Sequence, residues 1–530
     1  MSSRDMALVA AALLVGLALR LYFYVGLIAN DDLTHIFNAH RMFIGGGDYG
    51  GENVRLPGGL SARRLGVNVP LGLSMLIFGV HEWSLVLVPL VFSLAGIVIV
   101  SALLYVLAGR AAGVLAAWLW ACLPADVYSA TMVLQDSIFA TVFAASLLAL
   151  AASERAGRWR GVQALLAGAA FAGLVYVKEV ACLLVVPLAI WGAWTLWRAR
   201  GRDARGLYLA AGLLAVHTAL AAYFWTQMHE PLGFWTRTWA AYTNFGHTMP
   251  DSFRAARHAL HGHLSENWDF GRGSLLFLPC LVGLLVNKQA RLRGLLLLLL
   301  VTQTVVLVYA LRGGAQTRYL LQVSVLFIVI TVLGLHSLLA RLPAPWPQRL
   351  AAPAAILLVL ATAGSLRRSH QEWLEPGPGI RQAFNYLSAC AAADDRIHML
   401  GRSAAVTGNT FRVLAGFRQF KGGICNVRSP GDAATGWAVL TWSAYSEPAD
   451  ESWRAIPPNW LELFRAAGPR SEVVTHVFKI LPQAPPPFVQ VVSGGLTALS
   501  SEKKGSEKEE PAFLPNSQAA GGAKPDGSRP

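Results

Sequence analysis

Long apolar runs constrain this chain more than any other feature. A helix of roughly 20 apolar residues crosses a bilayer, because its backbone N–H and C=O groups are satisfied within the helix. Such runs recur at residues 6–29, 83–108, 111–123, 136–152, 161–177, 179–196, 207–225, 273–287, 294–311, 318–339 and 350–366. They predict a polytopic α-helical membrane protein with about eleven spans. The run 111–123 is short, so we expect it either to extend toward Tyr128 or to form a re-entrant piece.

The placement of positive charge predicts the orientation of these spans. The chain has a formal net charge of +14 although only 14% of its residues are charged. Thirteen Lys and Arg residues lie in one set of alternate connections between residues 110 and 349, and three lie in the other set: Lys178, Arg312 and Arg318. The positive-inside rule then places the N-terminus in the cytoplasm. It places the loops 30–82 and 226–272, and everything after residue 366, outside. Because the charge is explained by orientation, we expect no nucleic-acid partner.

A different pattern follows the last apolar run. Short apolar stretches at 396–400, 437–442 and 475–481 alternate with helix-like segments and predict a small α/β domain over residues 367–490, outside the membrane. Residues 491–530 are rich in Lys, Glu, Gly and Pro and cannot bury a core, so we expect a disordered tail. The cysteines show no metal-ligand spacing, and whether Cys390 and Cys425 pair stays open.

Three carboxylates fall at the predicted outer surface. Asp31 and Asp32 follow the first run, and the apolar Leu33 and Ile36 after them predict a helix in the membrane interface with the acids at its N-terminal end. Asp136 opens a later run. Each acid has a simpler interpretation as a cap or first-turn charge of its helix.

Several cations reach the same surface. Lys178 interrupts two apolar runs, Arg318 opens a late run, and Arg20 lies in the outer half of the first run, where an unpaired charge is costly. Lys178 could instead snorkel to the interface or pair with Glu179. Since the orientation was inferred mainly from other residues, this convergence favours a site in which cations bind a lipid phosphate and a carboxylate accepts a proton.

These residues also carry a resemblance. The acidic pair followed by His35 and Ala39, the Pro-Leu segment with Phe78-Gly79 before the second span, Asp136, the Gly173 to Lys178 motif, and Arg318-Tyr319-Leu320 occur in this order. In this the chain resembles the GT-C superfamily, and within it the protein O-mannosyltransferase-like family that includes the lipid A aminoarabinose transferases. The resemblance covers roughly residues 6 to 340.

The resemblance implies an inverting glycosyltransferase in the bacterial inner membrane. It would move a sugar from a polyprenyl-phosphate donor to a lipid, glycan or protein acceptor at the outer face. Asp31 would take the proton of the acceptor, with Asp32 and Asp136 orienting the acceptor or tuning Asp31. Lys178, Arg318 and Arg20 would hold the donor phosphate.

One departure from the family leaves a donor contact open. Where the family often has Lys or Tyr before Pro-Pro-Leu, this chain has Asn68 before Val-Pro-Leu. Arg55, Arg63 or Arg64 could supply the missing phosphate contact.

Other interpretations remain at this point. A divalent metal, Mg or Mn, could bind between Asp31 and Asp136 and do the work of the cations. A transporter or flippase for a lipid-linked sugar could use the same intramembrane charges as a substrate path. A scaffold could keep the fold without catalysis. The sequence specifies neither the donor sugar, nor the acceptor, nor the oligomeric state.

Overall fold

The computed structural model describes the parts of the chain that form most of its helices and one sheet. The described residues are 2–27, 31–45, 64–155, 157–198, 204–229, 321–339, 378–392, 394–400, 404–415, 424–426, 435–443, 459–467 and 473–481, with single positions and short pieces at 232–238, 294–302, 360–367 and 457. The predicted span 273–287, most of the span 350–366, residues 46–63 of the first outer loop, most of the second outer loop and the tail after residue 490 lie outside the described residues.

Eight long helices coincide with predicted apolar runs. They are α1 (Ser3–Tyr22), α4 (Glu82–Ala108), α5 (Arg110–Ala121), α7 (Gln135–Ser153), α8 (Arg160–Val175), α9 (Cys182–Arg198), α10 (Arg205–Met228) and α15 (Leu321–Leu339). Among the helices described, α1, α4, α7 and α10 are long and apolar enough to cross a membrane by length and composition. The fold class predicted from the sequence, a mostly helical membrane protein with a small C-terminal α/β region, is confirmed.

The run 111–123 does not continue as one helix to Tyr128. Helix α5 ends at Ala121, and the short helix α6 (Pro124–Ser129) starts anew at a proline, which suits the first helical position because its missing N–H would have no partner there.

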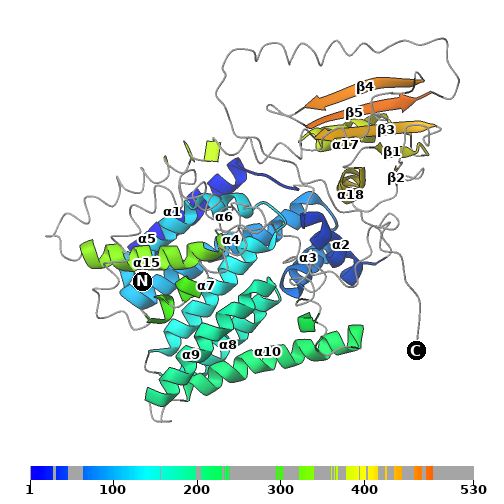
Figure 1. The fold of residues 1–530 in the computed structure, drawn as a ribbon. Coiled ribbons are helices and arrows are strands. Elements are labelled where there is room, and N and C mark those ends of the chain that lie inside the picture. Colours follow the sequence, from blue (N-terminus) through cyan, green and yellow to red (C-terminus); the bar gives the residue numbers. More distant parts are fainter. Residues whose placement is uncertain are drawn as a thin grey trace, which may run out of the picture. The chain divides into compact units, whose positions relative to one another are not determined.

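Helix α7 lies at the centre of the bundle, between α4 and α8, and α10 packs on the other side of α8 (Figure 1). The α8–α10 contact is close because it is made by glycines. A Cβ atom on Gly168 would lie 2.0 Å from the carbonyl oxygen of Leu209, and one on Gly212 would lie 2.0 Å from that of Leu165. Small residues at crossings of this kind are typical of helices packed in membranes, where backbones approach closely.

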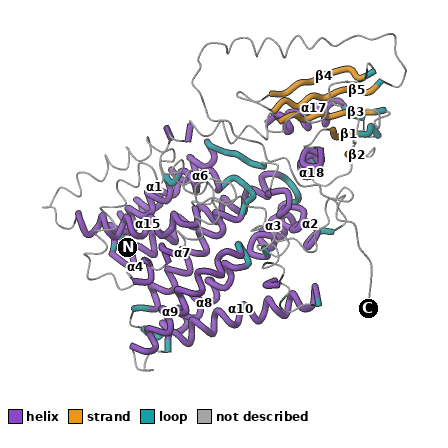
Figure 2. Tube along the Cα trace, viewed as in Figure 1, coloured by secondary structure: helices purple, strands orange, loops and turns teal. Residues whose placement is uncertain are grey.

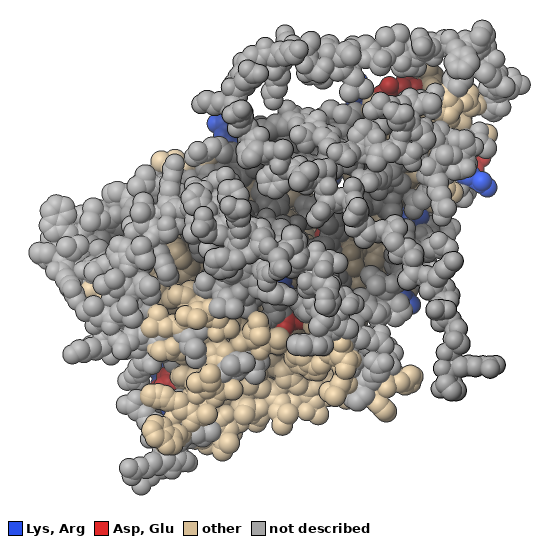
Figure 3. Space-filling model, in the orientation of Figure 1, with Lys and Arg blue, Asp and Glu red and all other residues tan. Residues whose placement is uncertain are grey.

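The outer helices present apolar side chains outward. The apolar window of α7 is 72% buried, but those of α1 and α10 are only 17% buried. Figure 3 shows almost no Lys, Arg, Asp or Glu on the described surface over α8, α9 and α10. An apolar surface of this extent on helices of this length fits contact with lipid rather than water.

Three shorter elements lie at the ends of the long helices. They are α2 (Asp31–Phe43), α3 (Leu65–Phe78) and the single turn η3 (Glu179–Ala181). Helix α2 starts at Asp31, as the sequence predicts, and packs against α3. It is buried on most of its circumference, including Asp32 and His35, and not only along the face of Leu33, Ile36 and Phe37.

All strands in the described part of the chain belong to the C-terminal α/β region (Figure 2). They are β1 (Ile397–Leu400), β2 (Ile424–Asn426), β3 (Gly436–Ser443), β4 (Trp460–Ala467) and β5 (Val473–Ile480), in the order β2-β1-β3-β5-β4. Strand β1 pairs in parallel with β2 and β3, whereas β5 is antiparallel to β3 and β4. Two helices, α17 (Pro378–Cys390) and α18 (Ala404–Leu414), accompany the sheet. Cys390 and Cys425 are both free thiols.

Asp395, two residues before β1, forms hydrogen bonds to side chains of β3 and β5. Its Oδ2 atom accepts hydrogen bonds from Trp437 Nε1 at 2.7 Å, Lys479 Nζ at 2.9 Å and the backbone N–H of Ala392 at 3.0 Å. Burial by itself would raise the pKa of Asp395, but the three donors and the Lys479 charge outweigh it and hold that pKa below its usual value. Its stabilising contribution is therefore complete above the unfolded pKa of about 4 and is lost as the pH falls through the lower folded value.

We expect Asp395→Asn to loosen β3 and β5 at pH 7 by about 1–2 kcal/mol, because it weakens charge-assisted hydrogen bonds. Hydrogen exchange of the purified full chain, read by mass spectrometry, measures this, and the difference from wild type should shrink below about pH 4. Glu462→Gln is the control, since Glu462 forms a more exposed pair with His476, at 2.6 Å. Equal effects of the two substitutions at pH 7 would contradict the prediction.

Candidate functional site

The start of α2 brings polar side chains into the interior next to α3 and α7. Asp32 and His35 are both fully buried. His35 Nδ1 lies 3.3 Å from Asn68 Oδ1 on α3, and its Nε2 lies 3.0 Å from Gln135 Oε1 at the start of α7. With amide oxygens at both ring nitrogens, either His35 is doubly protonated or one amide presents its NH2 group instead. His35 thereby joins three helices at one point.

Asp136 and Lys178 form a buried ion pair beside this junction. The Lys178 ammonium lies 3.1 Å from Asp136 Oδ1, and the side chains are 7% and 0% exposed. Lys178 follows the end of α8, where its backbone N–H bonds to the carbonyl of Leu174. Asp136 is within the first turn of α7 and is not the N-cap, which is Leu134. A buried charge without a partner costs several kcal/mol, so loss of either Asp136 or Lys178 would destabilise the chain.

Glu179 takes a different partner from the one considered for it above. Its carboxylate accepts two hydrogen bonds from Arg64, from Nε at 3.0 Å and from Nη2 at 2.8 Å. This two-pronged geometry is the strong form of an Arg–carboxylate pair. Arg64 is the N-cap residue of α3, so the pair fixes the start of α3 against the segment that carries Lys178.

A glycine lets the two segments approach. The backbone N–H of Gly66 bonds to the carbonyl of Tyr176 at 3.0 Å. A Cβ atom on Gly66 would lie 2.4 Å from Val177 Cγ2 and 3.2 Å from the backbone N and Cα of Val177. The residue before Lys178 is thus held directly against the first turn of α3.

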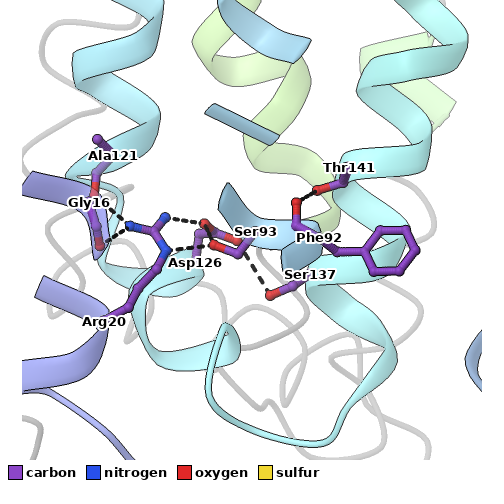
Figure 4. A network of polar contacts seen from close by, with 8 residues as sticks. All are labelled: Gly16, Arg20, Phe92, Ser93, Ala121, Asp126, Ser137 and Thr141. Carbon is purple, nitrogen blue, oxygen red and sulfur yellow. Dashed lines mark hydrogen bonds and ion pairs between the residues drawn. The ribbon is translucent and has the colours of Figure 1, made fainter. Parts of the chain in front are cut away.

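The structure brings three of the predicted site residues into one connected region: Asp136, Lys178 and Arg64. Asp32 is buried on α2, one turn before His35, which lies against Gln135 next to Asp136. Arg20 lies in a separate buried network with Asp126 (Figure 4). The side chain of Asp31, and the whole of Arg55, Arg63 and Arg318, lie outside the described residues.

Four residues of these networks were not assigned a role from the sequence. Asn68 stands where the family often has Lys or Tyr, Gln135 directly precedes Asp136, and Glu179 directly follows Lys178. Asp126 is the ion-pair partner of Arg20, at 2.5 Å. A search for the carboxylate that a buried Arg20 requires would have found it, because Asp126 lies between two apolar runs.

The arrangement offers buried positive and negative charge at neighbouring helix ends, and amide groups around a histidine. Such a site can bind an anion at the cations and hold a carboxylate for proton transfer. Within the described ranges, no group of three or more His, Cys, Asp or Glu side chains is placed to hold a metal. At Asp136 the chain supplies positive charge itself, through Lys178.

Comparisons with known proteins give the following matches. A model of the family described as dolichyl-phosphate-mannose-protein mannosyltransferase matches residues 66–225. A search of curated protein sequences gives no match. Among solved structures, ArnT from Cupriavidus metallidurans in the apo state has 14% identity and a TM-score of 0.58, covering 91% of this chain and 99% of that one.

Two further structures are similar. ArnT from the same organism bound to undecaprenyl phosphate has 13% identity and a TM-score of 0.56, with 91% and 99% of the two chains covered. The Archaeoglobus fulgidus oligosaccharyltransferase in complex with Zn and sulfate has 12% identity and a TM-score of 0.52, with 89% and 73% covered. Likenesses at this level of identity establish a shared fold.

Proposed function

The chain has the GT-C fold of membrane glycosyltransferases, and from this premise we propose that it transfers a sugar from a polyprenyl-phosphate donor to an acceptor at the membrane surface. The observation that carries the proposal is the buried Asp136–Lys178 pair, 3.1 Å apart, whose neighbour Gln135 contacts His35 on α2, the helix that starts with Asp31 and Asp32. An acid and cations at one set of helix ends match what this reaction needs. The ArnT structure bound to undecaprenyl phosphate supports the donor class.

The proposed reaction is a single displacement. The acceptor oxygen forms a bond to the anomeric carbon as the bond from that carbon to the phosphate oxygen breaks, so the configuration inverts. The electron pair stays on the phosphate, whose charge Lys178, Arg64, Arg63 and Arg318 neutralise, and the acceptor proton passes to Asp31. A phosphate leaves without protonation when cations surround it, so one base suffices, unlike the two carboxylates of a glycosidase.

Asp32 and Asp136 would act beside the base. Asp32 is fully buried at the N-terminal turn of α2, where it can orient the acceptor and influence the proton affinity of Asp31. Asp136 would hold Lys178 in place. Because Lys178 already brings positive charge to Asp136, we propose that protein cations rather than Mg or Mn hold the phosphate.

The proposed location completes the assignment. The N-terminus lies in the cytoplasm of a bacterium, the site opens at the outer face of the inner membrane, and the α/β region is extracytoplasmic. The acceptor, a lipid, glycan or protein, would be recognised by that region and the outer loops.

The experiment that tests the proposal separates transfer from transport. Purified protein in detergent is incubated with polyprenyl-phosphate sugars and candidate acceptors, and products are identified by mass spectrometry, guided by the glycoconjugate that disappears in a deletion strain. A transferase forms product without a membrane barrier. Loss of the glycoconjugate in cells without any product in detergent would favour the flippase, and an unchanged deletion strain would favour the scaffold.

We expect Gly66→Ala to lower transfer by about 10- to 100-fold, because displacing Val177 by a fraction of an ångström moves the adjacent Lys178. Steady-state kinetics of the purified variant measure this. Gly173→Ala is the matched control, because a Cβ atom there meets nothing within 4 Å. This variant should keep full activity, and its free energy of unfolding should rise by about 0.5–1 kcal/mol because Ala favours a helix over Gly. Full activity of Gly66→Ala would show that Lys178 does not depend on this contact.

A further inference from the structure

Arg20 is held in a fully buried network that the proposed reaction does not use. It lies in the last turn of α1 and is 0% exposed. Its guanidinium donates to Ser93 Oγ at 2.6 Å, to the carbonyls of Gly16 at 2.7 Å and Ala121 at 3.0 Å, and to Asp126 Oδ2 at 2.5 Å (Figure 4). These bonds engage Nε, Nη1 twice and Nη2, out of the five N–H donors of an arginine.

Asp126 is the centre of the network. Its Oδ2 atom also accepts a hydrogen bond from Ser93 Oγ at 2.5 Å, and its Oδ1 accepts one from Ser137 Oγ at 3.4 Å. Ser93, Asp126 and Ser137 are all fully buried. Each side-chain nitrogen of Arg20 and each carboxylate oxygen of Asp126 has a hydrogen-bond partner. Loss of one member of the pair would leave the charge of the other buried without its counter-ion.

The network ends at the entry to α7. Ser137 directly follows Asp136, and one turn further Thr141 Oγ1 donates to the carbonyl of Phe92, the neighbour of Ser93, at 2.7 Å (Figure 4). The segment between α6 and α7 is also bonded to the segment that follows α1, since the backbone N–H groups of Gly26 and Val25 donate to the carbonyl and hydroxyl of Thr131, at 3.1 and 3.0 Å. The backbone that carries Asp136 is therefore fixed from α1, α4 and α6.

We propose that Arg20 and Asp126 are positioning residues that hold the start of α7, so that Asp136 keeps Lys178 in place for the donor phosphate. Arg20 then acts through Asp126 and does not touch the phosphate. This inference rests on the proposed function, because the network is proposed to hold residues of the phosphate site in place.

Asp126→Asn distinguishes a positioning role from direct phosphate binding by Arg20. If Arg20 were a phosphate ligand, neutralising Asp126 would leave the affinity for phosphate unchanged or raise it. For a positioning pair, Asp126→Asn weakens binding by about 10-fold, the effect of a lost hydrogen bond to a charged group, and Arg20→Gln weakens it similarly. Arg20→Lys, which keeps the charge, should recover part of the loss. The probe is undecaprenyl phosphate, titrated into the purified full chain.

A milder pair of variants covers the case in which Asp126→Asn does not fold. Ser137→Ala and Ser146→Ala each remove a fully buried hydroxyl from α7, but Ser146 donates to the carbonyl of Val142 within the helix. Similar melting temperatures, with weaker binding of undecaprenyl phosphate only in Ser137→Ala, support the proposal. Equal affinity in Ser137→Ala and Ser146→Ala, or unchanged or tighter binding by Asp126→Asn, overturns it. If the wild type itself does not bind this probe, the donor assignment fails instead.

Discussion

Replacement of Asp31 by Asn is expected to lower the turnover number for sugar transfer by about 100- to 10,000-fold, the usual cost of losing a general base. Donor affinity should change little, because the proposed phosphate contacts come from cations and not from Asp31. Asn keeps the size and the hydrogen-bonding ability of Asp at the start of α2, which begins at Asp31, so the helix should persist. Single-turnover kinetics with a saturating polyprenyl-phosphate sugar measure the chemical step directly.

Two further variants are compared with Asp31→Asn. Asp5→Asn changes an acid in the first turn of α1, where Asp5 forms a capping box with Ser2; it should leave turnover unchanged. Asp32→Asn alters a fully buried carboxylate and should lower turnover less than Asp31→Asn. If Asp31→Asn keeps wild-type turnover, Asp31 is a helix cap and the base lies elsewhere.

The helices of the fold could be predicted because they follow from length and hydrophobicity alone. Runs such as 83–108 and 136–152 become α4 and α7 within a few residues, since a long apolar segment in a membrane has few alternatives to a helix. The alternating stretches 437–442 and 475–481 likewise became β3 and β5.

Strand β4 shows where local reasoning fails. Its residues, Trp460–Ala467, include Leu, Glu, Arg and Ala, which favour a helix by intrinsic propensity. They form an edge strand because β5 offers a full row of pairing partners, with a bulge between Glu462 and Phe464. Pairing across the chain overrides a difference in propensity that is small for each residue.

The partners of Lys178 and Glu179 could not be predicted from the sequence. Lys178 adjoins Glu179 in sequence, yet Lys178 pairs with Asp136 and Glu179 pairs with Arg64. Neighbouring side chains at the end of a helix point in different directions, so the choice depends on which elements pack nearby. The sequence therefore predicts which charged residues are unusual, and the fold decides how they are joined.

Lys178→Met is expected to abolish most transfer and to destabilise the chain. The substitution removes the proposed phosphate contact, worth about 100- to 1,000-fold in turnover. It also leaves Asp136 buried without its ammonium partner, at a cost of about 3–5 kcal/mol. The double variant Lys178→Met with Asp136→Leu removes both charges, so its melting temperature should return toward the wild-type value. Its transfer activity should stay low, because the cation proposed to hold the phosphate is still missing. Lys178→Arg, which keeps a cation, should retain more activity than either.

An ion pair at the other end of α7 is the matched control for this cycle. Glu154 directly follows α7 and lies 2.7 Å from Arg205, the first residue of α10, and each is partly exposed. Arg205→Met should cost about 1 kcal/mol or less and leave transfer unchanged. The measurements are thermal unfolding in detergent and transfer kinetics on the same samples. Recovery of both stability and transfer in the double variant would contradict a phosphate role for Lys178, because Lys178 would then be needed only to compensate the charge of Asp136. Recovery of stability without recovery of transfer would show that transfer needs the Lys178 cation itself, whereas stability needs only that neither charge is buried alone.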